Sequence, residues 1–233
     1  MTDDTRDDAP GRLSGDDLQD AVFDAVLFDL DGTLVDSTHA VDLAWARFLR
    51  EEGLDPALPN THGVPSRTKA EQVLPPERRT EGTARYDAIE LETTEGVVAL
   101  PGVAELLAGL GTRWTIVTSC SRALAVVRLT AAGLDVPERF VTVDDVTRGK
   151  PDPEPFARGA ALMGAAPQRC LAVEDAPAGL ASARAAGCTT LGVATTHPLG
   201  ALDADVAVAA ITDVRLAVGP EGVRLSRTPR GAR

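Results

Sequence analysis

A short apolar segment of the chain, residues 25–28, is followed at once by the carboxylates of Asp29, Asp31 and Asp36. Carboxylates crowded in this way repel one another unless a cation lies among them. A divalent cation with oxygen ligands would relieve that repulsion, and a carboxylate held beside such a cation is a competent nucleophile. Something at the end of this buried strand must therefore offset the crowding of like charges.

Polar side chains also follow three later apolar segments of the chain. They are Thr118 and Ser119, Lys150, and Glu174 with Asp175. A single aspartate at the end of a strand is more often a helix cap or a turn residue than a catalyst. In open parallel sheets, however, ligands bind outside the carboxyl ends of the strands. Four polar groups in such positions predict one shared site.

The position of these side chains depends on the elements that carry them. Short apolar runs alternate with amphipathic runs of helical length after residue 101. Predicted strands cover residues 25–28, 114–119, 140–146, 170–175, 189–195 and 206–211, and predicted helices cover residues 103–111, 122–133, 153–164 and 178–187. Strands separated by helices form parallel sheets. We therefore expect an α/β fold, a Rossmann-like parallel sheet with helices on both faces.

One segment interrupts the alternation. Residues 38–96 contain few β-branched runs, and apolar residues recur at helical spacing over residues 39–54. We expect a small α-helical cap domain, residues 38–96, inserted into a core domain of residues 21–37 and 97–215. The acidic residues 1–20 and the basic residues 216–233 contain few large apolar side chains, and we expect both to be flexible tails.

The composition limits the possible partners. The net charge of −12 argues against binding to nucleic acids or to anionic membranes, which requires basic surfaces. Three cysteines without paired spacing predict neither a disulfide framework nor a zinc site. The first residues are acidic where a signal peptide would be basic, and no apolar run is long enough to span a membrane. We expect a cytoplasmic protein.

Four segments resemble the four motifs of the haloacid dehalogenase-like superfamily in order and spacing: FDLDGTLVDS, VTS, GKPDPEPF and VEDAPAGLASARAAG. The helical insertion directly after the first motif resembles the cap of the phosphoglucomutase-like branch. The segments HGVPSR, VALPGV and GVATTHP resemble those of sugar-phosphate and glycerol-phosphate phosphatases. The resemblance implies a phosphatase that acts on a small phosphorylated metabolite.

The resemblance also assigns roles. It implies that Asp29 is the nucleophile that forms an aspartyl-phosphate, and that Asp31 protonates the leaving oxygen and later deprotonates the attacking water. It implies a Mg²⁺ ion bound by the carboxylates of Asp29 and Asp175 and by the backbone carbonyl of Asp31. Glu174 is expected close behind these ligands.

The remaining core residues would bind the phosphoryl group. Lys150 would neutralise phosphoryl oxygens and hold the Asp29 carboxylate. Thr118 would donate its hydroxyl and Ser119 its backbone N–H to phosphoryl oxygens. Both residues could instead cap the helix that follows.

Substrate specificity is expected on the cap. His62, Gly63 and Arg67 resemble a cap loop that faces the active site in sugar phosphatases, and Arg67 is the expected substrate contact. A surface ion pair is the alternative for Arg67. Trp45 is expected to pack inside the cap. Lys69 raises the possibility of a Schiff base, as in phosphonoacetaldehyde hydrolases of this branch, but its sequence surroundings differ from theirs.

Three polar residues have weaker claims to a role. His39 and His197 share no helical spacing, so we expect them to lie at the hinge into the cap and at the rim of the site rather than to bind metal. Arg122 could reach the substrate from the core, or lie on the surface.

Four functions compete. The favoured one is a Mg²⁺-dependent phosphatase for a small sugar or polyol phosphate, active as a monomer or weak homodimer. A β-phosphoglucomutase-type phosphoryl transferase is the alternative, but Val41 stands where that type has a histidine. A dehalogenase is disfavoured because Asp31 would have no role in its chemistry. A non-catalytic phosphometabolite-binding protein would not need the intact set of acidic residues and Lys150.

Overall fold

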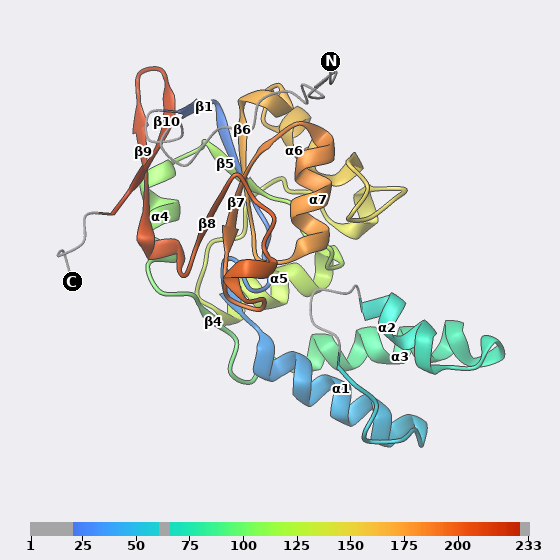
Figure 1. The fold of residues 1–233 in the computed structure, drawn as a ribbon. Helices are drawn as coiled ribbons and strands as arrows, with labels where there is room; N and C mark the ends of the chain where they lie inside the picture. Colours follow the sequence, from blue (N-terminus) through green and yellow to red (C-terminus); the bar gives the residue numbers. More distant parts are fainter. Residues whose placement is uncertain (1–20, 61–65, 229–233) are drawn as a thin grey trace, which may run out of the picture.

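The structure is a computed structural model, and it describes residues 21–60 and 66–228. Figure 1 shows a larger body, in which helices flank a sheet, and a smaller body of helices connected to it by two segments of the chain. The two connections contain β3 (Val35–Asp36) and β4 (Val98–Ala99), which pair as antiparallel strands. The inserted helical domain is therefore joined to the core through a two-stranded hinge.

The centre of the larger body is a five-stranded parallel sheet in the order β5-β2-β6-β7-β8. Its strands are β2 (Ala25–Phe28), β5 (Trp114–Ile116), β6 (Cys170–Glu174), β7 (Thr189–Val193) and β8 (Val206–Val208). Every residue of β2 and β6 is buried, which explains why these segments are continuously apolar up to their ends. The predicted α/β fold with a Rossmann-like sheet is confirmed.

Helices cover both faces of this sheet. On one face, alternate residues of β2 and β6 pack with α4 (Val103–Leu110) and α5 (Arg122–Ala131). On the other face, the intervening residues pack with α6 (Glu154–Leu162) and α7 (Pro177–Ala186). Single 3₁₀ turns cover Pro76–Arg78, Val143–Asp145, Pro167–Arg169, Leu199–Ala201 and Ile211–Asp213. Successive side chains along each strand point to opposite faces of the sheet, so they belong to two separate hydrophobic clusters.

The strand expected over residues 140–146 is not formed. Only Val141 makes a bridge, to Val117 at the edge of the sheet, and the 3₁₀ turn Val143–Asp145 follows directly. The carboxylate of Asp145 accepts hydrogen bonds from the backbone N–H and the hydroxyl of Thr142. This capping arrangement fixes the turn, which competes with continuation of the strand.

The prediction of a flexible tail from residue 216 is wrong for residues 216–227. β9 (Val214–Gly219) and β10 (Gly222–Arg227) form a hairpin that pairs with β1 (Val22–Phe23) in a second, antiparallel sheet. Val223 and Leu225 are buried against the cluster that contains α4. In a strand, every second side chain points to the same face, so a short basic segment with apolar residues at alternate positions can cover one edge of the core. The predicted tail of residues 1–20 lies outside the described residues.

The cap consists of α1 (Thr38–Glu52), α2 (Ser66–Val73) and α3 (Arg79–Glu92). Buried residues of α1 recur three and four positions apart, as the sequence predicts: Ala40, Val41, Ala44, Trp45, Phe48 and Leu49. Trp45 packs inside the cap, with its ring centroid 5.6 Å from that of Phe48 and 5.5 Å from that of Tyr86. The cap therefore has a hydrophobic cluster of its own, separate from those of the core.

Candidate active site

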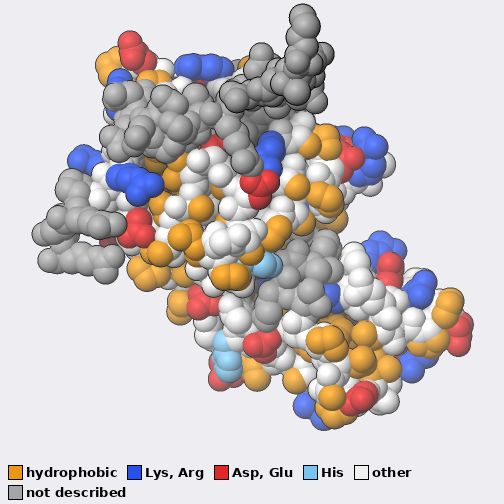
Figure 2. Space-filling view, in the orientation of Figure 1, with side chains coloured by type: hydrophobic (Ala, Val, Ile, Leu, Met, Phe, Trp, Pro, Cys, Tyr) orange, Lys and Arg blue, Asp and Glu red, His pale blue; other side chains and the backbone are white. Residues whose placement is uncertain are grey.

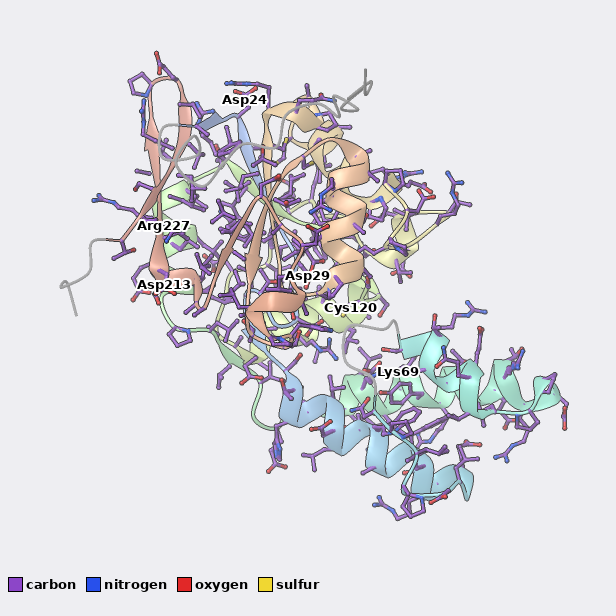
Figure 3. All side chains as sticks on the ribbon, in the orientation of Figure 1. Asp24, Asp29, Lys69, Cys120, Asp213 and Arg227 are labelled. Carbon is purple, nitrogen blue, oxygen red and sulfur yellow. The ribbon has the colours of Figure 1, made fainter. Side chains whose placement is uncertain are left out.

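A pocket of about 100 Å³ lies where the carboxyl ends of the strands face the cap. Figure 3 shows Asp29 at the end of the sheet, with Cys120 between it and Lys69 of the cap. The seven core residues expected at the site all line this pocket: Asp29, Asp31, Thr118, Ser119, Lys150, Glu174 and Asp175. Six of them lie at or follow the ends of β2, β5 and β6, which the parallel topology brings together, and Lys150 comes from the loop after the 3₁₀ turn Val143–Asp145.

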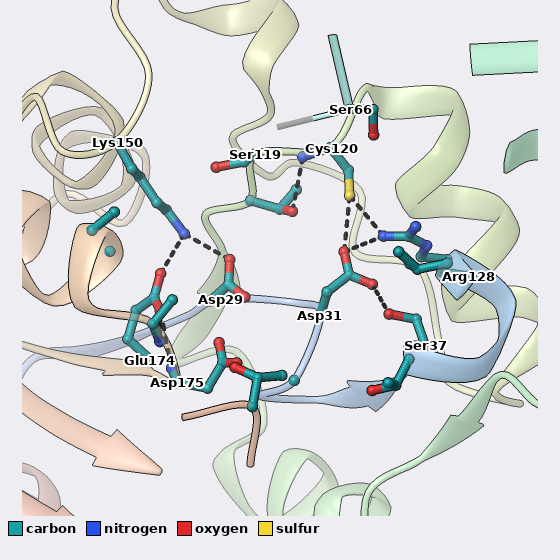
Figure 4. A pocket seen from close by; sticks show the side chains of 18 of the residues that line it. Asp29, Asp31, Ser37, Ser66, Ser119, Cys120, Arg128, Lys150, Glu174 and Asp175 are labelled. Atoms are coloured by element: carbon teal, nitrogen blue, oxygen red, sulfur yellow. Dashed lines mark hydrogen bonds and ion pairs between the residues drawn. The ribbon is translucent and has the colours of Figure 1, made fainter. Parts of the chain in front are cut away.

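Lys150 connects two of the carboxylates. Its Nζ lies 2.6 Å from Asp29 Oδ1 and 2.7 Å from Glu174 Oε1 (Figure 4). It also donates to the Val117 carbonyl at 2.8 Å. Burial opposes the positive charge, but the two carboxylates together raise the pKa of Lys150 above its usual value. The ammonium group is thus held charged beside Asp29, with all three donors used.

Both oxygens of Glu174 have partners in the core. Oε1 accepts from Lys150, and Oε2 accepts the backbone N–H groups of Asp175 and Ala176, each at 2.9 Å. A Cβ at Gly179, in the first turn of α7, would lie 1.6 Å from Oε1 of this side chain. The absence of a side chain at residue 179 therefore makes room for the carboxylate. Glu174 holds Lys150 and the loop that carries Asp175.

The donor set fits a hard divalent cation. Ligand oxygens of Asp29, Glu174 and Asp175 all lie within 4.8 Å of one another, and all three residues are buried. Burial raises the pKa values of the Asp29 and Asp175 carboxyls, and the nearby Glu174 carboxylate adds to the increase. Lys150 supplies only one positive charge to this group. An oxygen-liganded cation such as Mg²⁺ would offset the remaining negative charge.

Gly32 allows the backbone turn after β2 to approach the carboxylate of Asp175 closely. Its φ of +79° lies in the left-handed region, and a Cβ at this position would lie 2.2 Å from Asp175 Oδ2. The hydroxyls of Thr33 and Thr196 donate to the two oxygens of Asp175. The turn after β2 is therefore shaped around the Asp175 side chain.

Asp31 has a different set of partners. Its Oδ1 accepts from Ser37 Oγ at 2.6 Å, and its Oδ2 accepts from Cys120 Sγ at 2.9 Å and forms an ion pair with Arg128 Nη1 (Figure 4). Burial raises the pKa of the Cys120 thiol well above its usual value, which keeps it a donor. Asp31 is thus fixed in orientation in the pocket lining, on the side opposite Lys150.

The sequence analysis missed Arg128. Its side chain is only 7% exposed and contacts Asp31, Cys120 and Glu90 of the cap. Burial opposes its charge, but Asp31 and the neighbouring acids raise its pKa further. The sequence contained one signal for Arg128: it lies next to Leu129, on the apolar face of the helix that became α5. A charged residue on an apolar helix face requires a buried partner.

Thr118 and Ser119 are free of the capping role that was the alternative for them. The N-cap of α5 is Ser121, whose side chain accepts the backbone N–H of Leu124 at 3.3 Å. Thr118 is buried, and its hydroxyl accepts the N–H of Cys120 at 3.1 Å. Its hydroxyl proton therefore remains available to a ligand in the pocket.

The cap residues differ from expectation. Arg67 does not line the pocket: its side chain is 76% exposed and pairs with Glu71 at 3.0 Å, as in the surface alternative. His62 and Gly63 lie outside the described residues. Lys69, one helical half-turn from Arg67, lines the pocket instead and is 5% exposed. The two cations lie on different faces of α2, and only the face with Lys69 lines the pocket.

Three other candidates lie beside the pocket rather than in its lining. His39 is exposed near Glu95 at the hinge into the cap, and His197 contacts the hydroxyl of Thr196 at the rim of the site. Arg122 donates to Phe140 O and pairs with Asp145, each at 2.8 to 2.9 Å, so it stabilises the 3₁₀ turn. It does not reach the pocket.

The fold and the site together define a hydrolase with a Rossmann-like core, a helical cap, and buried carboxylates at the end of the central strand β2. The chain belongs to the haloacid dehalogenase-like hydrolase family, which matches residues 23–187.

Named relatives agree with this assignment. The chain is 46% identical to hexitol phosphatase A of Escherichia coli (strain K12) over 175 residues, 72% of this chain and 81% of the relative. It is 36% identical to validoxylamine A 7'-phosphate phosphatase of Streptomyces hygroscopicus subsp. limoneus, over 83% of this chain and 97% of the relative. The crystal structure of a hydrolase from Pseudomonas syringae superposes with a TM-score of 0.68 at 28% identity, covering 79% of this chain and 91% of that one.

Proposed function

We propose that the protein is a Mg²⁺-dependent phosphatase that hydrolyses a small sugar or polyol phosphate monoester through an aspartyl-phosphate. The observation that carries the proposal is the contact of Lys150 with Asp29 in a buried pocket that also contains Asp175. The names of the two relatives, a hexitol phosphatase and a phosphatase for a 7'-phosphate, support the substrate class.

In the first step, an Asp29 carboxylate oxygen attacks phosphorus while the bond from phosphorus to the ester oxygen breaks. Asp31 gives its proton to that oxygen, so the alcohol leaves neutral. In the second step, Asp31 takes a proton from water, the water oxygen bonds to phosphorus, and the bond to Asp29 breaks. Inorganic phosphate leaves, and both carboxyls return to their starting states.

Charge stabilisation comes from the surroundings of Asp29. Lys150 neutralises phosphoryl oxygens, and the Thr118 hydroxyl and the Ser119 backbone N–H donate to them. Bound Mg²⁺ supplies further neutralisation of the phosphoryl charge. Its ligands would be the carboxylates of Asp29 and Asp175 and the backbone carbonyl of Asp31, with Glu174 behind them.

The mutase alternative has less support. Val41, which stands where that type has a histidine, lines the pocket and brings no proton-transfer group to it.

We also propose that the enzyme acts in the cytoplasm as a monomer or weak homodimer. All three cysteines, Cys120, Cys170 and Cys188, are unpaired thiols, as expected in a reducing compartment. In the described part of the chain, no helix has the length and apolarity required to cross a bilayer. Acidic and basic side chains are interspersed on the face shown in Figure 2.

The test is phosphate release from glycerol, hexitol and hexose phosphates and from p-nitrophenyl phosphate, with Mg²⁺ and with a chelator. D29N should lose at least about a thousandfold in kcat, because an amide is not a nucleophile toward phosphorus. Its Tm should stay close to that of the wild type, because the amide oxygen can still accept from Lys150, so the loss of turnover would not come from unfolding. Turnover by D29N at the wild-type rate would exclude Asp29 as the nucleophile, and isomerisation of β-glucose 1-phosphate without phosphate release would favour the mutase.

A further inference from the structure

The end of the pocket farthest from Lys150 is lined by three buried charged side chains. Lys69 of α2, Glu90 of α3 and Arg128 of α5 are 5%, 3% and 6% exposed. The first two belong to the cap and the third to the core. Charged side chains are rarely buried to this extent unless each is paired. The hydrogen bonds of these side chains among the described residues therefore show which donors and acceptors a bound molecule could supply.

Glu90 has unused acceptor capacity. Its Oε1 accepts from Arg128 Nη2 at 3.4 Å, a long hydrogen bond, and its Oε2 has no hydrogen-bond partner among the described residues. Burial raises the pKa of the Glu90 carboxyl, while Arg128 and Ser66 act in the opposite direction. A buried carboxylate oxygen without a donor is costly, so a bound molecule with a hydroxyl or amine would stabilise it.

Lys69 has unused donor capacity. Its Nζ donates to Asn60 Oδ1 at 3.1 Å and lies 5.9 and 5.6 Å from the ring centroids of Trp45 and Tyr86. An ammonium group has three donors, and Asn60 is the one acceptor that the described residues offer it. A bound molecule with an oxygen acceptor would use the others.

Acidic and basic side chains are equal in number at this end of the pocket. Lys69 and Arg128 are basic, and Glu90 and Asp31 are acidic. Arg67, the other cation of α2, points away and pairs with Glu71. A ligand part that both donates and accepts hydrogen bonds and has no net charge is complementary to this arrangement. Hydroxyl groups have these properties, whereas a second phosphate or a carboxylate would approach the Glu90 oxygen, Oε2, to which no described residue donates.

We propose that Lys69 and Glu90 are specificity-determining residues, which bind hydroxyl groups of a neutral, hydroxylated leaving group. The inference rests on the proposed phosphatase function, in which Asp31 protonates the leaving oxygen. Arg128 contacts both Asp31 and Glu90, so a leaving group that meets Asp31 extends toward Glu90 and Lys69. The pocket thus holds the phosphoryl group at Asp29 and Lys150, and the alcohol part at the cap.

The test compares E90Q and K69M with the wild type on a hexitol phosphate, p-nitrophenyl phosphate and phosphoglycolate. R67Q is the matched control, because Arg67 is on the same helix as Lys69 and outside the pocket. We expect E90Q and K69M to lower kcat/KM for the hexitol phosphate by about ten- to a hundredfold, and to change it for p-nitrophenyl phosphate by no more than about threefold. E90Q should also raise the activity on phosphoglycolate relative to the hexitol phosphate.

Equal losses on hexitol and p-nitrophenyl phosphates, or a wild-type preference for phosphoglycolate, would overturn the inference while leaving the phosphatase intact. If E90Q does not fold, as judged by its melting curve, K69M provides the test. The ratio of its kcat/KM for the hexitol phosphate to that for p-nitrophenyl phosphate then supports or overturns the inference. A wild-type protein that releases phosphate from none of the three esters contradicts the proposed function itself, and this inference with it.

Discussion

The buried Arg128 of the core forms an ion pair with the partly buried Asp31, which follows β2. The same guanidinium contacts Glu90 of the cap, 3.4 Å away. One side chain thus links the residue expected to protonate the leaving group with the domain expected to recognise it. Because Arg128 is not expected to touch the phosphoryl group, we assign it as a positioning residue.

Removal of this arginine should affect stability and activity in distinct ways. R128M leaves Asp31 and Glu90 without their buried cation, so we expect the free energy of unfolding to fall by about 3–5 kcal/mol. The kcat for an alkyl phosphate should fall by a larger factor than that for p-nitrophenyl phosphate, whose leaving group needs less protonation. R122M is the control, because Arg122 is on the same helix but is 43% exposed and pairs at the surface. Equal losses on the two esters would assign Arg128 a purely structural role.

The carboxylates of the proposed metal site should make stability depend on pH. The folded, metal-free protein keeps protons on Asp29 and Asp175 that the unfolded chain loses above the ordinary pKa of 3.8. The unfolded state therefore binds fewer protons, and the contribution of these groups to stability falls as pH rises above that value. Mg²⁺ replaces these protons, so the increase in Tm on adding Mg²⁺ should be larger at about pH 8 than at about pH 5. The same increase at both pH values, or in D175N, would contradict this assignment.

Gly32 should be sensitive to a single methyl group. Gly32 and Gly53 both have positive φ values, +79° and +67°, but a Cβ at residue 53 would meet nothing within 4 Å. G53A should therefore cost only about 1–2 kcal/mol, the strain of a left-handed alanine. G32A adds a clash with Asp175, so it should cost more and abolish the Mg²⁺-dependent increase in Tm. Urea unfolding of both variants, with and without Mg²⁺, measures the difference.

The C-terminal hairpin should contribute to the stability of the core. Leu225 is 3% exposed and packs in the main hydrophobic cluster, whereas Val218 of the same hairpin is 46% exposed. We expect L225A to lower the free energy of unfolding by about 2–5 kcal/mol and V218A to change it by less than about 0.5 kcal/mol. Similar, small effects of both substitutions in urea unfolding would mean that the hairpin does not support the core.

Most of the core of the site could be predicted because its residues are local to strand ends. Asp29 and Asp175 each follow an apolar run that forms a strand, and a parallel sheet places such ends on one edge. Lys150 was identified by its motif, because the apolar run before it forms no strand. The structure confirms the sheet and brings these residues together. The strand over residues 140–146 could not be excluded in advance, since the capping of a 3₁₀ turn by Asp145 depends on individual hydrogen bonds.

The sequence by itself determined which acidic and polar residues follow β2, β5 and β6, the family and the insertion of a helical cap, because these depend on motif order and local periodicity. Only the tertiary structure decided which cap cation faces the pocket, since Arg67 and Lys69 differ by two positions on one helix and the packing of α2 selects Lys69. It also decided that Arg128 and Glu90 meet across the two domains. Contacts between residues 38 positions apart arise from packing of whole elements, which no local pattern records.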